Sequence, residues 1–121
     1  MIDIQLLDTP LRAQDCLDQV ASDEAGGTTL FVGTVRNNTQ GRAVVRLEFE
    51  AYRPMAISEM RKIAERAAEK WSAKHISIHH RIGTLEIGDI AVLIAVATPH
   101  RAASFEACQF AIDTLKETVP I

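Results

Sequence analysis

Hydrophobic and polar residues along this chain follow two periods, one typical of strands and one typical of helices. Ile2, Ile4 and Leu6 alternate with polar residues, which predicts a short first strand. Residues 28–36 and 90–98 are apolar on both faces. Because such strands usually lie between neighbours in a sheet, we expect both segments to be central and buried.

Three segments show the spacing of three and four residues that gathers apolar side chains on one helical face. They are residues 9–20, 54–71 and 102–119. Pro54 suits the first turn of a helix, where a missing N–H leaves no hydrogen bond unmade. Pro120 cannot continue a helix, so we expect it to end the last one.

Residues 45–51 alternate with a period of two and predict a half-exposed strand, and residues 76–82 return to the same period. Residues 37–42 are polar and aperiodic, which predicts a mobile surface loop. The predicted order is β-α-β-β-α-β-β-α. It indicates an α+β fold, a mostly antiparallel sheet with packed helices. A single domain over residues 1–121 fits the length of the chain.

Composition places the chain among soluble globular proteins, with 47% hydrophobic and 24% charged residues. The net charge of −3 argues against general nucleic-acid binding, so an anion site would need a local concentration of cations. The N-terminus lacks signal-peptide features, and the longest apolar run, residues 90–97, is too short to cross a bilayer. We therefore expect a cytoplasmic protein that binds neither nucleic acid nor membrane.

Cys16 and Cys108 both fall in segments of helical spacing, and they form no CxxC pair. We interpret them as buried free thiols in a reducing compartment. A nucleophilic or persulfide-forming cysteine is the alternative.

His100 and Arg101 lie at the start of the last predicted helix. Positive side chains there oppose the helix dipole, at a cost of roughly 0.3–1 kcal/mol each. A phosphate bound by the free N–H groups and the arginine fork would offset that cost. The two residues are therefore either an anion site or a solvated pair that tolerates the penalty.

Arg36 and Lys116 are the other candidate cations. Arg36 follows a predicted buried strand, where a rigid element can aim it at a ligand, although a surface ion pair is the alternative. Gly33 in that strand allows close approach of a ligand or marks a bulge. Lys116 borders the apolar stripe of the last helix. Its partly desolvated amine is a plausible acid, base or nucleophile, or it simply covers the edge of the core.

The length of the last predicted helix limits which cations can act together. At a rise of 1.5 Å per residue, His100 and Lys116 lie about 24 Å apart along an unbroken helix. A small metabolite is too short to reach both. Either the two residues serve different sites, or a symmetric dimer brings the start of one helix near the end of another. We favour the dimer.

The remaining histidines are weaker signals. His75, His79 and His80 sit in a predicted strand, and no carboxylate or cysteine spacing completes a zinc site. The GxGxxG, Walker A and GxSxG motifs do not occur in the sequence. We predict no metal and no cofactor.

Seven segments of the chain form a recognisable set of motifs. They are FVGTVRN at 31–37, YRPMA at 52–56, HRIG at 80–83, IGD at 87–89, HRAASFEAC at 100–108, DTLK at 113–116 and VPI at 119–121. Together they resemble the large, catalytic subunit of molybdopterin synthase. The match follows the order and spacing of the family from about Gly27 onward, which is more specific than any single motif.

The resemblance implies an α/β-hammerhead-type fold and a sulfurtransferase of molybdenum cofactor biosynthesis. In the family, cyclic pyranopterin monophosphate becomes molybdopterin when two dithiolene sulfurs are installed. The sulfur arrives as a thiocarboxylate at the C-terminus of a small ubiquitin-like carrier subunit, which agrees with the lack of a convincing catalytic cysteine here. A homodimer of large subunits binds one carrier at each end, as a heterotetramer. Both large subunits contribute to each active pocket.

The resemblance also implies roles for individual residues. The implied substrate-binding residues are Thr34, Val35, Arg36, His100, Arg101 and Lys116. The charged residues would bind the phosphate and pterin, whereas Thr34 and Val35 would line the pocket. Lys116 is also the implied catalytic residue, beside the terminal glycine of the carrier. There it would stabilise the thiocarboxylate and its anionic intermediates, or shuttle protons as the cyclic phosphate opens.

Two positions depart from the family pattern. The family commonly continues past residue 121 with a Trp-Lys-Lys-Glu-like segment that supplies a second active-site lysine, and we expect this tail to be missing from the sequence. Asn38 stands where a histidine is common, so that role does not carry over. The alternatives to the enzyme are a non-catalytic oligomeric module that binds a phosphorylated ligand, and a paralogue that binds the carrier without turnover.

Overall fold

A four-stranded sheet forms the centre of the computed structural model, which describes residues 1–39, 41–43 and 45–119. In spatial order its strands are β1 (Ile2–Leu7), β6 (His75–Arg81), β8 (Ile90–Thr98) and β2 (Gly27–Thr34). β1 runs parallel to β6, and the other two pairings are antiparallel. The predicted α+β class with a mostly antiparallel sheet is confirmed.

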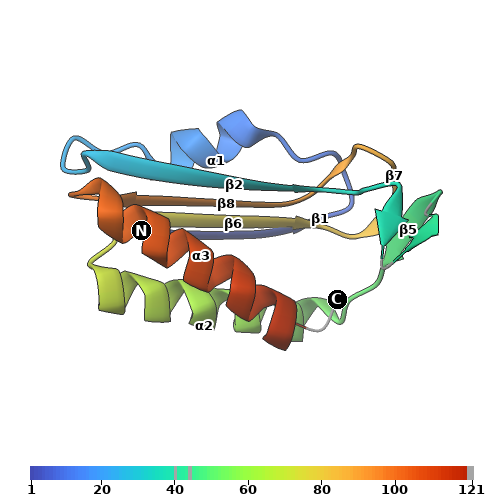
Figure 1. Ribbon diagram of the computed structural model, residues 1–121. Coiled ribbons are helices and arrows are strands. Elements are labelled where there is room, and N and C mark those ends of the chain that lie inside the picture. Colours follow the sequence, from blue (N-terminus) through green and yellow to red (C-terminus); the bar gives the residue numbers. More distant parts are fainter. Residues whose placement is uncertain (40, 44, 120–121) are drawn as a thin grey trace.

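Helices cover both faces of this sheet (Figure 1). α2 (Arg53–Trp71) and α3 (Arg101–Thr118) pack side by side on one face, and the short α1 (Ala13–Val20) lies on the other. Alternate residues of β8 therefore enter two different cores. Because both of its faces are covered and both of its edges are paired, β8 is central, as predicted.

The apolar stripe of α2 explains how the larger core forms. Met60, Ile63 and Ala67 recur at helical spacing and are fully buried against the sheet and α3. Burying a side chain the size of Met60 or Ile63 contributes about 1.5–3 kcal/mol. The helix ends at Ser72, whose φ of 52° is the left-handed conformation common just after a helix.

The predicted central position of residues 28–36 is wrong. β2 pairs only with β8 and forms an edge of the sheet, so side chains such as Val32 are 42% exposed. The inner position beside β8 is taken by β6, which β1 covers on its far side. Apolar residues on β2 are therefore only half-buried in this chain.

A small second layer at one end of the sheet was not fully predicted. β5 (Arg46–Phe49) pairs antiparallel with β7 (Gly83–Glu86), a strand that the residue pattern did not indicate. A third cluster, which includes Val35, Leu85 and Ala91, joins this pair to the end of the main sheet. Figure 1 shows the two strands projecting there, and β5 lines the candidate site described below through Leu47 and Phe49.

Two local expectations also change, and a third cannot be compared with the described residues. The segment predicted as a loop contains a short hairpin, β3 (Asn38–Thr39) with β4 (Arg42–Ala43). The first helix begins at Ala13, later than Thr9-Pro10, because Arg12 has an extended backbone. The expected stop at Pro120 lies outside the described residues. None of the helices in these described ranges combines the length and the hydropathy that a membrane span requires.

Candidate active site

A cavity of about 400 Å³ opens where the end of the main sheet meets the C-terminal turns of α3 and the β5–β7 pair. Its walls are mostly apolar, and their larger side chains are Phe31, Leu47, Phe49, Val92, Leu115 and Val119. Such a cavity can hold the flat or bulky body of a small molecule, while a few polar groups set its orientation.

The polar side chains of the lining come from three separate elements. Thr34 ends β2 and Arg36 follows it, His80 lies on β6, and Lys116 lies in the last turn of α3. None of the described residues that line the cavity carries a carboxylate. Two cations without an acidic partner in an apolar cavity provide a favourable environment for an anion.

A β-bulge places Thr34, Val35 and Arg36. β2 pairs with β8 up to Gly33, which faces Val92, and the register then shifts so that Thr34 faces Ile90. A Cβ on Gly33 would lie 2.6 Å from Val92 Cγ1, so only glycine fits there without movement. The structure bears out the bulge, whose extra residue, Ala91, lies in β8, and the close approach at Gly33 is made by the Val92 side chain.

The chain beyond the bulge is held by backbone hydrogen bonds. Val35 N–H donates to the carbonyl oxygen of Asp89 at 3.0 Å, and Val35 accepts from Gly88 N–H at 2.9 Å. Val35 itself is buried in the third cluster. A rigid connection therefore aims Arg36 from a fixed point, although its side chain is exposed.

Lys116 reaches the cavity because its helix neighbour Leu115 is anchored. Leu115 is 5% exposed in the larger core, whereas Lys116 is exposed on the adjoining face. The position at the border of the apolar stripe matches the prediction.

His100 and Arg101 do not line this cavity. α3 is unbroken from Arg101 to Thr118, so these two residues stand at its far end, about 24 Å from Lys116 by the helical rise. Both are exposed. In a single chain, the predicted site residues thus fall into two groups, one at each end of α3.

The glycine pair at residues 26–27 serves packing at that far end. A Cβ on Gly27 would lie 2.6 Å from Arg101 Cα, and Gly26 N–H donates to the Pro99 carbonyl at 3.1 Å. The start of β2 therefore lies directly against the start of α3, which fixes where His100 and Arg101 emerge.

Sequence reasoning did not single out His80. It lines the cavity although it is only 5% exposed, and its ring lies edge-on to Phe49 with centroids 5.5 Å apart. A signal was present: His80 continues the two-residue period of Ile76 and Ile78, so it points toward the larger core. A polar residue in a core-facing position usually has a specific partner.

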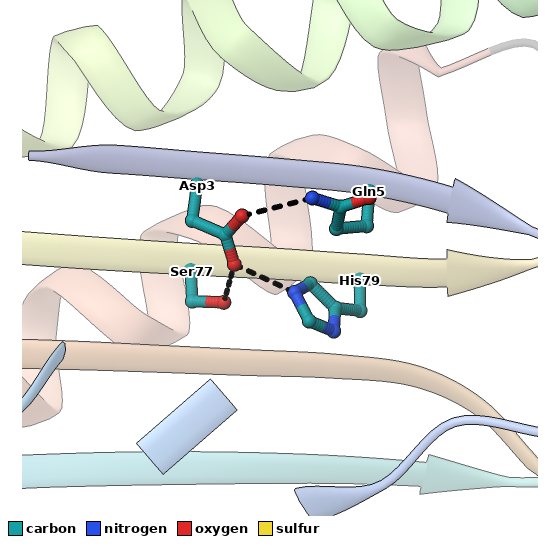
Figure 2. Close-up of polar contacts among 4 residues, drawn as sticks. All are labelled: Asp3, Gln5, Ser77 and His79. Atoms are coloured by element: carbon teal, nitrogen blue, oxygen red, sulfur yellow. Dashed lines mark hydrogen bonds and ion pairs between the residues drawn. The ribbon is translucent and has the colours of Figure 1, made fainter. Parts of the chain in front are cut away.

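His79 points to the opposite face and has a structural role. Asp3 on β1 accepts hydrogen bonds from His79 Nε2 at 2.7 Å, Ser77 Oγ at 2.8 Å and Gln5 Nε2 at 3.1 Å (Figure 2). Burial opposes ionisation of Asp3, but the bonds from His79, Ser77 and Gln5 outweigh it and lower the pKa below 3.8. This partly buried cluster joins the parallel strands β1 and β6.

The two cysteines are buried free thiols, as predicted. Burial raises the pKa of Cys16, and it raises the pKa of Cys108 to about 11. Because the thiolate is the nucleophilic form, neither side chain is suited to attack a substrate. In the described part of the chain, no cluster of three or more His, Cys, Asp or Glu residues could hold a metal ion.

Comparison with known proteins defines the class of protein. The crystal structure of molybdopterin synthase from Staphylococcus aureus matches with a TM-score of 0.91 and 40% identity, over 96% of this chain and 85% of that one. The molybdopterin synthase catalytic subunit of Bacillus subtilis is 45% identical over 97% of this chain and 74% of its own length. The human catalytic subunit is 51% identical over 92% of this chain and 59% of its own length.

The family described as MoaE protein matches residues 6–118. The chain belongs to this family of molybdopterin synthase catalytic subunits, which are sulfur-transferring enzymes of molybdenum cofactor biosynthesis.

Proposed function

We propose that this chain converts cyclic pyranopterin monophosphate into molybdopterin, with sulfur from the thiocarboxylated C-terminus of a small ubiquitin-like carrier subunit. The observation that carries the proposal is the composition of the cavity. Arg36 and Lys116 both line it, and none of the described lining residues carries a carboxylate. A phosphate suits the two cations, and a fused ring system suits the apolar walls. The relatives are named catalytic subunits, which fits a protein that works with another subunit.

Four residues of the cavity have assigned roles in this proposal. Arg36 binds the phosphate with its planar fork, and Thr34 and Val35 line the pocket beside it. Lys116 lies beside the carrier's terminal glycine. Its amine stabilises the thiocarboxylate and the anionic intermediates, or it moves protons as the cyclic phosphate opens.

His100 and Arg101 enter the proposal through a second copy of the chain. Since they stand at the far end of α3 from Lys116, they complete the cavity of a partner protomer in a homodimer. With one carrier on each protomer, the assembly is a heterotetramer. Its location in the cytoplasm remains a prediction.

Replacing Lys116 tests the catalytic assignment. With thiocarboxylated carrier and cyclic pyranopterin monophosphate supplied, Lys116→Ala should reduce kcat for molybdopterin formation by about 100-fold or more, because a positioned acid, base or cation is lost. Circular dichroism and carrier binding should stay unchanged. Lys62→Ala is the matched control, since Lys62 is an exposed lysine on α2, paired only with Glu59.

Undiminished product formation by Lys116→Ala would contradict the catalytic role of this residue.

Calorimetry distinguishes an enzyme from a regulatory module that only binds the ligand. A regulatory module would bind the pterin phosphate equally well with and without the carrier, and it would form no product in either case.

A further inference from the structure

His80 is the most enclosed polar group of the cavity. It is the penultimate residue of β6, and its backbone pairs with Val92 on one side and Leu6 on the other. Its side chain lies among the apolar residues of the larger core and meets the cavity there, at 5% exposure. By contrast, Thr34, Arg36 and Lys116 are exposed residues at the rim.

Hydrogen bonding determines which ring nitrogen of His80 carries the proton. Nδ1 lies 2.8 Å from the carbonyl oxygen of Arg81, and a carbonyl oxygen can only accept. Nδ1 is therefore the donor, and in the neutral ring Nε2 holds a free lone pair. Among the described residues, the hydrogen bond of the His80 ring is the one from Nδ1 to Arg81. The edge-to-face contact with Phe49 further restrains the ring.

The surroundings of His80 favour the neutral ring. Burial, and then the positive charge of Lys116, lower its pKa below 6.5, although the bond to Arg81 opposes them. The other polar side chains of the described lining are Arg36 and Lys116, which only donate, and Thr34, whose hydroxyl can do both. His80 Nε2 is thus an acceptor without a hydrogen on a buried lining residue, whereas the exposed lining residues Arg36 and Lys116 carry donors.

We propose that His80 is a specificity residue, which accepts at Nε2 a hydrogen bond from an N–H or O–H on the ring body of the ligand while Arg36 and Lys116 hold its anionic end. The ligand class is a phosphorylated heterocycle with a donor on its ring. The choice of cyclic pyranopterin monophosphate as the ligand rests on the proposed function. A simple phosphate would occupy the rim and would not need His80.

Two substitutions separate ligand recognition from a purely structural role. His80→Asn keeps a side-chain N–H near the position of Nδ1, where it can still donate to the Arg81 carbonyl, but it removes the acceptor. His80→Gln places an amide oxygen near the position of Nε2 and keeps the acceptor. Thermal unfolding of both variants, compared with wild type, reports any general damage to the core.

Calorimetry with cyclic pyranopterin monophosphate and with inorganic phosphate provides the test. We expect His80→Asn to weaken binding of the pterin by about 5- to 50-fold, because a donor on the ligand ring is then buried without an acceptor. His80→Gln should retain most of the affinity, and inorganic phosphate should bind all three proteins equally.

Equal pterin affinity of His80→Asn and wild type would overturn the proposal, as would an equal loss in both variants for both ligands. If wild type binds no cyclic pyranopterin monophosphate, the proposed function fails separately. The role of His80 is then tested by binding of guanosine monophosphate and of ribose phosphate. Both ligands carry a phosphate, but only the nucleotide has a heterocycle with N–H donors. A preference for the nucleotide that disappears in His80→Asn would support it, and no such difference would overturn it.

Discussion

Neighbouring histidines on β6 have opposite roles because successive strand residues face opposite sides of the sheet. His79 faces α1, where the Asp3 carboxylate binds it, and the pair links β1 to β6. His80 faces the larger core and borders the cavity beside Lys116. From the sequence, the two are adjacent residues of the same type. Because their side chains lie on opposite faces of the sheet, His79 has a structural role and His80 is available to a ligand.

The lowered pKa of His80 predicts a pH effect on stability. Below pH 6.5 the unfolded chain binds a proton at His80 before the folded chain does, so the free energy of unfolding should fall as the pH drops from 6.5 through the lower folded pKa. Above that window His80 adds no pH dependence. Glutamine does not titrate, so His80→Gln should show a shallower loss of stability between about pH 7.5 and 5 in urea unfolding. Identical slopes would contradict the assignment, since the other histidines are common to both proteins.

Two elements, β2 and α3, set the geometry of the site, because the candidate residues lie at their ends. β2 delivers Arg36 after the bulge at Gly33, and α3 carries Lys116 at its last turn and Arg101 at its first. The bulge depends on close contact between β2 and β8, whereas the separation along α3 follows from the helical rise. The site is therefore sensitive to small changes in β2.

Gly33→Ala tests the bulge. The new methyl group would lie 2.6 Å from Val92 Cγ1 and 3.1 Å from the ring of Phe31, so the strand or its neighbours must shift. We expect a loss of about 1–3 kcal/mol in the free energy of unfolding, measured by urea titration. Thr28→Ala, at an exposed position of the same strand, should change stability by only about 0.5 kcal/mol. Equal stabilities of the two variants would show that the bulge does not depend on this contact.

At the scale of the whole molecule, one chain holds an incomplete set of the predicted site residues. Its cavity contains Arg36 and Lys116, while His100 and Arg101 emerge beyond the other end of α3. The start of α3 is fixed by its direct contact with Gly27, so local movement of a terminus cannot bring the two groups together. If the proposed dimer forms, each cavity draws on both protomers.

Mixing two inactive variants tests this shared site. Lys116→Ala and Arg101→Ala should each form little product as pure dimers. After subunit exchange, activity should recover to about a quarter of wild type, because half of the dimers are mixed and each mixed dimer holds one intact site. Mixing Lys116→Ala with itself under the same conditions is the control. A monomer by sedimentation, or no recovery in a demonstrably exchanged mixture, would contradict the shared site.

The sequence alone determined most of the elements of this protein and several of its site residues. Periods of two and of three to four residues are local properties of the chain, so β8, α2 and α3 could be predicted from side-chain spacing. The resemblance to the family identified Thr34, Val35, Arg36 and Lys116, which the structure brings to one cavity. The short strand β7 left little periodic signal and was missed.

Only the tertiary structure decided the strand order and the full composition of the cavity. β2 has the apolar pattern of a central strand, yet long-range pairing of β6 with both β1 and β8 places β2 at the edge. His80 joins Lys116 because the end of β6 and the end of α3 pack at the same place. Such contacts depend on residues distant in sequence, whereas side-chain periodicity describes only neighbours along the chain.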